Sequence, residues 1–151
     1  MASKGYLELF HLIERLHRLF LDVLRIEIKK MGIRDLNGVQ AMLLANIGDQ
    51  DVVIRDLVDR GYYQGSNVSY NVKKLTDMGY LEQQRTEYDK RSVSLRLTEK
   101  AKVVVARVQA LDDETLGRVS DGQVGHDGID QACAALRQLE KTWSDYVRFG
   151  N

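Results

Sequence analysis

One short stretch, GSNVSYNVKKL at residues 65–75, is rich in polar and basic side chains. Those with a candidate role in binding are Ser66, Asn67, Ser69, Tyr70, Lys73 and Lys74. Val68, Val72 and Leu75 have the i, i+4, i+7 spacing that places apolar residues on one face of a helix. Tyr70 and Lys73 lie almost opposite that face. Outward hydroxyl, amide and amine groups can read base edges in the major groove of DNA, although a single helix of this kind is more often only solvated.

A charged turn follows at residues 87–91, EYDKR, between two segments that are predicted to be β-strands. Lys90 and Arg91 lie at its tip, and Arg85 lies near its base. An arginine on a narrow hairpin suits the minor groove, where groove width and potential are read. We expect Asp89 to orient Arg91 or to fix the turn, because a carboxylate repels phosphate. Taken alone, an ordinary charged hairpin explains this segment equally well.

The elements around these residues form a helix-turn-helix followed by a hairpin. A short helix is predicted at 54–60, and after a glycine-containing turn a second helix runs over 66–78 and ends at Gly79. Strands are predicted at 80–86 and at 92–98, where polar and apolar residues alternate. This order predicts a mainly α fold with a small β-hairpin wing, which is a winged helix-turn-helix.

Further elements flank this core on both sides. They are a helix at 6–31 ended by Gly32, a helix at 38–47, an extended pair at 52–53, a helix at 99–119 and a last helix from about Ile129. Asn37 with Gln40 three residues later predicts a capping box for the helix at 38–47. Thr98 is the predicted cap of the helix at 99–119. The chain is therefore expected to contain six helices and one hairpin.

The composition is that of a globular protein, with 44% hydrophobic and 29% charged residues and no proline. The single cysteine, Cys133, excludes an internal disulfide and fits a reducing cytoplasm. Its position on the apolar face of the last helix predicts a packed thiol. We see no signal peptide and no uncharged run near the roughly 18 residues of a membrane span, so no membrane association is predicted.

The net charge is zero, but the charges are unevenly distributed. Residues 60–102 carry nine basic and five acidic side chains, whereas residues 109–151 carry four basic and eight acidic ones. The basic excess coincides with the predicted helix-turn-helix and hairpin. This is the asymmetry typical of a nucleic-acid-binding segment.

Other chemistries find little support in the sequence. His11, His17 and His126 are isolated, and no pair of Cys or His residues has zinc spacing. The glycines of residues 122–128 follow no strand, so a nucleotide-binding loop is not predicted. No nucleophile and base stand out as a pair. We therefore expect neither an enzyme nor a metal or cofactor.

The run DKRSVSLRLTEKA, residues 89–101, resembles the wing signature of the MarR family of transcription regulators, D-x-R followed by a strand and L-T-x-x-G. The preceding SNVSYNVKKLTDMGYL, residues 66–81, is similar to that family's recognition helix. The resemblance implies a homodimer with intertwined first and last helices, bound to a pseudo-palindromic operator on double-stranded DNA. It also implies release by a small-molecule effector in many members, and we assign no residue to such an effector. Ala101 replaces the usual glycine, and Val53–Ile54 replace a capping hydroxyl, but neither is a predicted DNA contact.

We therefore expect one MarR-like domain over residues 1–151, with dimerisation helices at 1–34 and 126–151, a winged helix-turn-helix core at 36–98 and a connecting helix at 99–119. The first helix is apolar around most of its surface, which favours burial against a second subunit over burial within one chain. The predicted function is sequence-specific DNA binding by a cytoplasmic homodimeric repressor. The alternative is a winged-helix module that binds a protein partner and has lost DNA binding.

Overall fold

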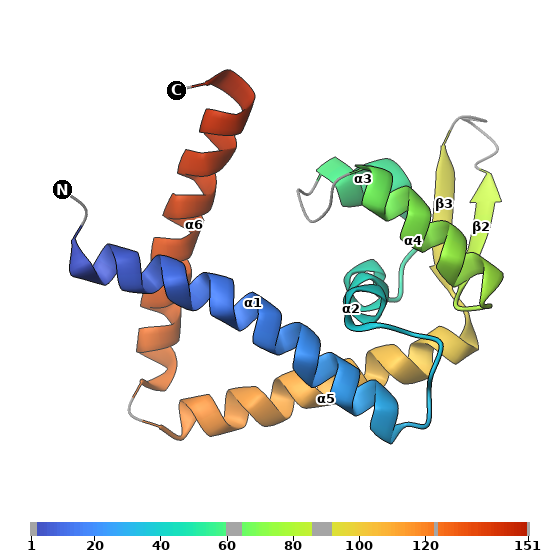
Figure 1. Cartoon of the computed structure of the whole chain (residues 1–151), viewed down its shortest axis with the longest axis horizontal. Helices are drawn as coiled ribbons and strands as arrows, with labels where there is room; N and C mark the ends of the chain where they lie inside the picture. The colour runs from blue at the N-terminus through green and yellow to red at the C-terminus, as the bar shows by residue number, and fades with distance from the viewer. Residues whose placement is uncertain (1–2, 60–64, 86–91, 123, 151) are drawn as a thin grey trace. The chain divides into compact units, whose positions relative to one another are not determined.

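Residues 3–59, 65–85, 92–122 and 124–150 are described in the computed structural model. They form six helices and three short strands (Figure 1). These elements fall into two compact units, Met1–Gln109 and Ala110–Asn151. Within the described ranges, no helix is both long enough and apolar enough to cross a membrane. The predicted mainly α architecture with a small β-sheet is confirmed.

The first unit holds most of the elements. In chain order they are α1 (Lys4–Lys30), α2 (Gly38–Ile47), β1 (Val52–Val53), α3 (Ile54–Asp59), α4 (Gly65–Asp77), β2 (Leu81–Arg85), β3 (Val93–Leu97) and the first half of α5 (Glu99–Ser120). The rest of α5 and α6 (Gly125–Phe149) make up the second unit.

Helix α2 lies in the core of the first unit, where Leu43, Leu44 and Ile47 are buried. Its predicted capping box is confirmed by two hydrogen bonds. Asn37 Oδ1 accepts from the backbone N–H of Gln40 at 2.8 Å, and Gln40 Oε1 accepts from the backbone N–H of Asn37 at 3.1 Å. Together they satisfy two of the amide groups that a helix start leaves unpaired.

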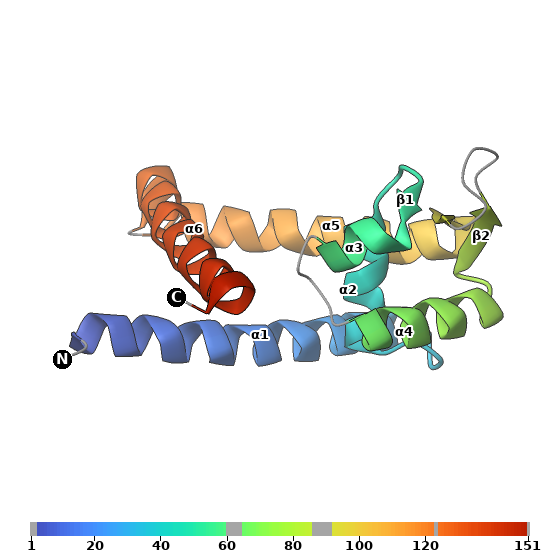
Figure 2. The ribbon, with the colours of Figure 1, turned by 90° about the horizontal axis from the view of Figure 1, so that it is seen from above.

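The start of α2 is in close contact with α1. Both views place α2 beside the C-terminal half of α1 (Figures 1 and 2). A Cβ atom built on Gly38 would lie 2.6 Å from the backbone oxygen of Leu21, and Gly38 itself is buried. Glycine is therefore required here for the close approach of the two backbones.

Helix α4 packs through its predicted apolar stripe, because Val68, Val72 and Leu75 are all buried. The helix ends as the sequence indicates. Gly79 has φ +80°, and the backbone N–H of Tyr80 donates to the oxygen of Leu75 at 2.8 Å. A residue in this left-handed conformation is the usual way to close a helix, and glycine adopts it without strain.

The sheet has three strands rather than the two of the predicted hairpin. β2 and β3 are antiparallel with Leu81 opposite Leu97 and Arg85 opposite Val93, and the strand order is β1-β3-β2. The predicted extended pair at 52–53 is β1, and it joins the other edge of β3, with Val52 opposite Leu95. The sequence predicts the extended pair but not its pairing with β3, since two residues carry no readable alternation.

The start of α5 and the end of α4 are connected by polar contacts. Thr98 Oγ1 accepts from the backbone N–H of Ala101 at 3.3 Å, which confirms its predicted role as a cap. Lys100 Nζ donates to the backbone oxygen of Met78 at 2.9 Å and lies 4.2 Å from the centroid of the Tyr80 ring. The buried Tyr80 in turn donates its hydroxyl to Asp35 Oδ1 at 2.9 Å.

Helix α6 begins at Gly125, four residues earlier than the start predicted near Ile129. The glycine-rich segment suggests a longer link because glycine disfavours helix. In the structure Gly128 lies inside the helix, where a Cβ atom would be 2.6 Å from Val124 Cγ1. Glycine at this position thus leaves room for the valine at the helix start.

Within the single chain, much apolar surface of α1 and α6 stays exposed. In α1 only Leu24 and Ile28 are buried, and Leu19 is 57% exposed. The described part of α6 has no buried residue, and Cys133 is only half-buried. A single-chain core around α1 is therefore wrong, and a packed environment for Cys133 would require a further surface.

Candidate nucleic-acid interface

Helix α4 presents a polar side to solvent. Asn67, Ser69, Lys73 and Lys74 are exposed, and Tyr70 is 61% exposed, while the apolar stripe holds the opposite side on the core. Ser66 belongs to the first turn of α4, and its side chain lies outside the described part of the structure. Five of the six predicted contact residues are thus placed together on the outer side of one helix.

Tyr70 and Lys74 are neighbours on this surface. Lys74 Nζ lies 5.8 Å from the centroid of the Tyr70 ring, which is within the range of a cation–π interaction. The pair combines a phenolic hydroxyl, which donates or accepts a hydrogen bond, with a positive charge one helical turn away. It can therefore contact a base edge and a phosphate at the same time.

Of the predicted wing residues, Arg85 is described. It is the last residue of β2, it is exposed, and it pairs with Val93 on β3. Asp89, Lys90 and Arg91 lie outside the described residues. The strands that lead to them are described, and β2, which pairs with β3, contacts α4 (Figure 1).

Two polar contacts fix the sheet around the helix-turn-helix. Gln83 Nε2 donates to Thr76 Oγ1 at 3.0 Å, which joins β2 to α4. Arg96 Nε and Nη2 donate to the two carboxylate oxygens of Asp51 at 2.8 and 2.9 Å, which joins β3 to the residue before β1. The hydrogen bond from the Arg96 guanidinium lowers the pKa of the Asp51 carboxyl below its ordinary value. A two-pronged pair of this kind also fixes relative orientation.

Sequence reasoning missed the partners that lie far apart along the chain. Asp51 and Arg96 are 45 residues apart, so their pairing becomes visible only with the register of β1 on β3. From the sequence, Gln40 is recognisable only as half of a capping box. Its second contact, to Asn71 on α4, spans 31 residues and has no local signal.

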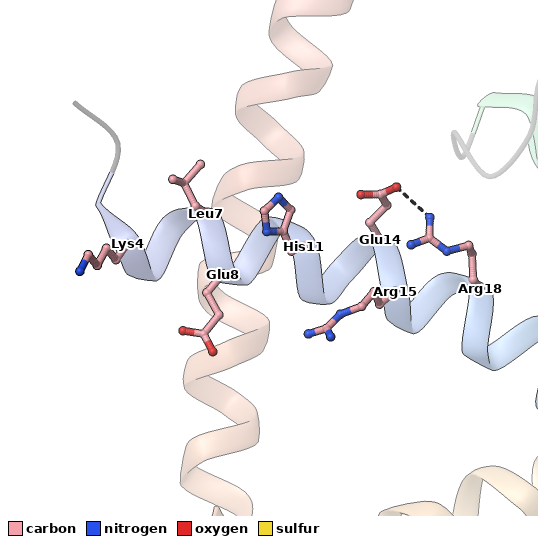
Figure 3. Close-up of a pocket in the computed structure, with 7 residues that line it drawn as sticks. All are labelled: Lys4, Leu7, Glu8, His11, Glu14, Arg15 and Arg18. Atoms are coloured by element: carbon pink, nitrogen blue, oxygen red, sulfur yellow. Dashed lines mark hydrogen bonds and ion pairs between the residues drawn. The ribbon is translucent and has the colours of Figure 1, made fainter.

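A pocket of about 590 Å³ lies along the N-terminal half of α1. Figure 3 shows the seven residues that line it, and all of them come from this one helix. They are Lys4, Leu7, Glu8, His11, Glu14, Arg15 and Arg18. All seven are exposed, and Arg18 is already paired with Glu14 at 2.7 Å. The pocket is thus an open groove lined mainly by charged residues and their aliphatic stems. Neither in this groove nor in the rest of the described ranges are three His, Cys, Asp or Glu residues grouped so as to hold a metal ion.

A short helix, a second helix with an outward polar side and an adjoining antiparallel sheet together define a winged-helix DNA-binding domain. Residues 36–101 match the family described as winged helix DNA-binding domain. Over 145 residues the chain is 35% identical to the exopolysaccharide II synthesis transcriptional activator ExpG of Rhizobium meliloti (strain 1021), with 96% of this chain and 75% of that protein covered.

Two solved structures share the fold. A MarR family transcriptional regulator from Listeria monocytogenes complexed with 26mer DNA has a TM-score of 0.79 at 21% identity, over 100% of this chain and 97% of that one. A MarR protein from Peptoclostridium difficile has a TM-score of 0.77 at 17% identity, over 96% and 94% of the two chains. The chain belongs to the family of winged-helix transcription regulators that includes the Rhizobium activator, and it shares the fold of the MarR regulators.

Proposed function

We propose that the protein is a homodimeric regulator that binds a pseudo-palindromic operator in double-stranded DNA, with one α4 helix of the dimer in each half-site. The observation that carries this proposal is the two-sided character of α4, which is buried along Val68, Val72 and Leu75 and polar on its outer side. In a winged-helix protein such a helix enters the major groove with its N-terminal residues toward the bases.

The contact residues divide by role. Ser66, Asn67, Ser69, Tyr70 and Lys73 are the proposed base readers of the recognition helix α4. Lys74 is the proposed phosphate contact, because it lies in the last turn of α4, away from the N-terminal residues that face the bases. On the wing, Arg91 is proposed to enter the minor groove, Lys90 and Arg85 to contact the backbone, and Asp89 to orient Arg91.

The second subunit supplies the cover for α1 and α6. Each of the two helices would leave several large apolar side chains exposed on a monomer, and exposed apolar patches mark interaction sites. The proposed domain therefore extends over residues 1–151, with 1–34 and 126–151 contributing to the dimer around the core at 36–98 and the connecting helix at 99–119. A symmetric dimer matches a symmetric operator, since each subunit reads one half-site.

The proposed role is binding and involves no chemical reaction. Its site of action is the cytoplasm, where chromosomal operators lie in bacteria. Repression stays a prediction from the resemblance, and the Rhizobium relative is described as an activator. Deleting the gene and measuring the transcripts of genes beside the bound sites gives the sign of regulation, because loss of a repressor raises the levels of those transcripts. A small-molecule effector also stays a prediction, with no residues assigned.

The test begins by selecting fragments bound from the source genome and measuring affinity for the selected operator and for random duplex of equal length. Tyr70→Ala should weaken operator binding by about 1–3 kcal/mol for each base interaction that it removes, with little effect on random duplex. Equal weakening on both DNAs would refute its role in reading bases.

Salt dependence separates phosphate contacts from the rest. Lys74→Ala should make the log–log salt slope shallower by about 2, because one phosphate contact, which accounts for about 0.9 of the slope, is removed in each of the two subunits. Lys90→Ala should act in the same way. The control is Arg118→Ala on α5, which removes an exposed charge outside both the proposed DNA contacts and the proposed dimer helices and should leave the slope unchanged. If the Lys74 and Lys90 variants both keep the salt slope of the parent, neither the helix nor the wing contacts a DNA phosphate through these lysines.

A further inference from the structure

Gln40 is a polar side chain in an apolar place. It is 6% exposed, and it is the buried polar residue of the described core. A buried amide is costly unless its donor and acceptor groups are paired. The contacts of Gln40 therefore indicate what this residue contributes beyond packing.

Both ends of the Gln40 amide are engaged, and on different elements. Its Oε1 accepts from the backbone N–H of Asn37 within the capping box of α2. Its Nε2 donates across to Asn71 Oδ1 on α4 at 3.4 Å, a long hydrogen bond. Asn71 Nδ2 then donates to the backbone oxygen of Asn67 at 3.0 Å. A continuous polar chain thus runs from the start of α2 to the first part of α4.

This series of hydrogen bonds ends beside the proposed base-reading residues. Asn67 precedes Ser69 and Tyr70, which are exposed on the same helix. In the same half of α4 the described attachment is otherwise apolar, through Val68 and Val72, whereas the polar contact of Thr76 with Gln83 lies toward the other end of the helix. Apolar contacts are non-directional, so they hold the helix on the core with little preference for its exact rotation or axial position. A hydrogen bond between side chains has a required direction and distance, and it can fix both.

The start of α2 is itself a fixed support. Gly38, two residues before Gln40, lies so close to α1 that a Cβ atom there would be 2.6 Å from the Leu21 oxygen. The first turn of α2 therefore contacts the backbone of α1 on one side and Asn71 of α4 on the other. The position of α4 is thereby fixed relative to α1, the helix proposed to join the two subunits.

We propose that Gln40 is a positioning residue for operator recognition, which acts through Asn71 to hold the base-reading side of α4 in register with the DNA. It does not touch DNA, since it is buried. This inference rests on the proposed function and adds a residue outside the interface. Its loss should reduce discrimination between sequences, whereas contacts to the phosphate backbone, which tolerate small shifts, should remain.

The test compares Gln40→Met, Asn71→Ala, the double variant and Asn37→Ala. Methionine has a similar length to glutamine and suits a buried site, but it cannot donate to Asn71. Asn37→Ala removes the side-chain half of the capping box and leaves the contact between Gln40 and Asn71 in place, so it is the matched control for helix stability. For each variant the affinities for selected operator and random duplex are measured at one salt concentration, together with the melting temperature.

Gln40→Met should lower the operator-to-random affinity ratio by about tenfold, the size of a single base contact, and should leave affinity for random duplex within about twofold. Asn71→Ala should give the same reduction, and the double variant should be no worse than either single variant. Asn37→Ala should lower the melting temperature and keep the parent ratio. If Gln40 were only structural, both affinities would fall together with the folded fraction, and an unchanged ratio would overturn the proposal.

Additive effects in the double variant would also overturn it, because they would mean that Asn71 contacts DNA independently of Gln40. If Gln40→Met does not fold, Asn71→Ala is the deciding variant, because Asn71 is half-exposed and its loss should be tolerated. An operator-to-random affinity ratio equal to that of the parent in Asn71→Ala would then contradict the proposal. Failure of the proposed function has a different signature, in which the parent protein itself does not discriminate between any selected fragment and random duplex.

Discussion

Substituting alanine for Gly38 should destabilise the fold, although the same change usually stabilises a helix. Gly38 has no positive φ, so alanine meets no backbone strain there. The added Cβ would lie 2.6 Å from the backbone oxygen of Leu21 and 3.3 Å from its carbonyl carbon. Neither atom belongs to a flexible side chain, so relief requires the backbones of α1 and α2 to separate.

The magnitude follows from two opposing effects. Overpacking of this kind costs about 1–3 kcal/mol. Alanine also has less conformational freedom than glycine in the unfolded chain, which stabilises the folded state by about 0.4–1 kcal/mol. We expect a net decrease of about 1–2 kcal/mol in the free energy of unfolding, which lowers the melting temperature by about 2–8 °C in a chain of this size.

The matched control is Gly117→Ala in α5. Gly117 is also helical and exposed, and a Cβ atom there would meet nothing within 4 Å. This variant should gain about 0.5–1 kcal/mol. Both are compared with the parent by thermal and denaturant unfolding at one protein concentration, because the stability of a dimer depends on concentration. A rise in melting temperature for Gly38→Ala similar to that of Gly117→Ala would refute the close contact of α1 and α2.

Three other changes test separate parts of the structure. Tyr80→Phe should cost about 1–2 kcal/mol in denaturant unfolding because the hydrogen bond to Asp35 is removed. Burial raises the pKa of Tyr80 to about 12, whereas an unfolded tyrosine ionises near 10. The stability advantage of the parent over this variant should therefore be constant just below pH 10 and should shrink between pH 10 and pH 12. Parallel pH profiles of the two proteins would contradict this. Arg96→Lys keeps the charge but loses the two-pronged bond to Asp51. The salt slope should persist, but the preference for operators with A·T-rich flanks, whose narrow minor groove suits the proposed Arg91 contact, should weaken. An unchanged flank preference would argue against a wing positioned by this bond. Leu19→Glu should convert the dimer to a monomer in sedimentation, and a dimer of parent strength would exclude α1 from the interface.

Local features of the fold could be predicted because their signals lie within a few residues. The apolar stripe of α4, its end at Gly79 and the capping box of Asn37 with Gln40 each depend on spacings of three to seven residues, and the structure confirms them. These patterns reflect helix geometry alone, so no knowledge of the rest of the chain is needed.

The missed features depend on contacts between distant segments. The pairing of β1 with β3 is invisible in two valines, and the second partner of Gln40 lies on another helix. The early start of α6 runs against local propensity, because Gly125 and Gly128 both lie within the helix although glycine disfavours it. In the candidate site the side of α4 was predictable from periodicity, whereas the residues that hold it in place were not.

The contact of Lys100 with the end of α4 has an electrical consequence. A helix behaves as a dipole, with roughly half a positive charge at its amino end and half a negative charge at its carboxyl end. In α4 the carboxyl end is compensated from within the protein, where the Lys100 ammonium is bonded to the Met78 oxygen. The first turn of α4 contains no acidic residue, so none of the helix's own carboxylates offsets the positive amino end of the dipole. A chain of zero net charge can therefore attract a phosphate through an oriented helix as well as through its lysines.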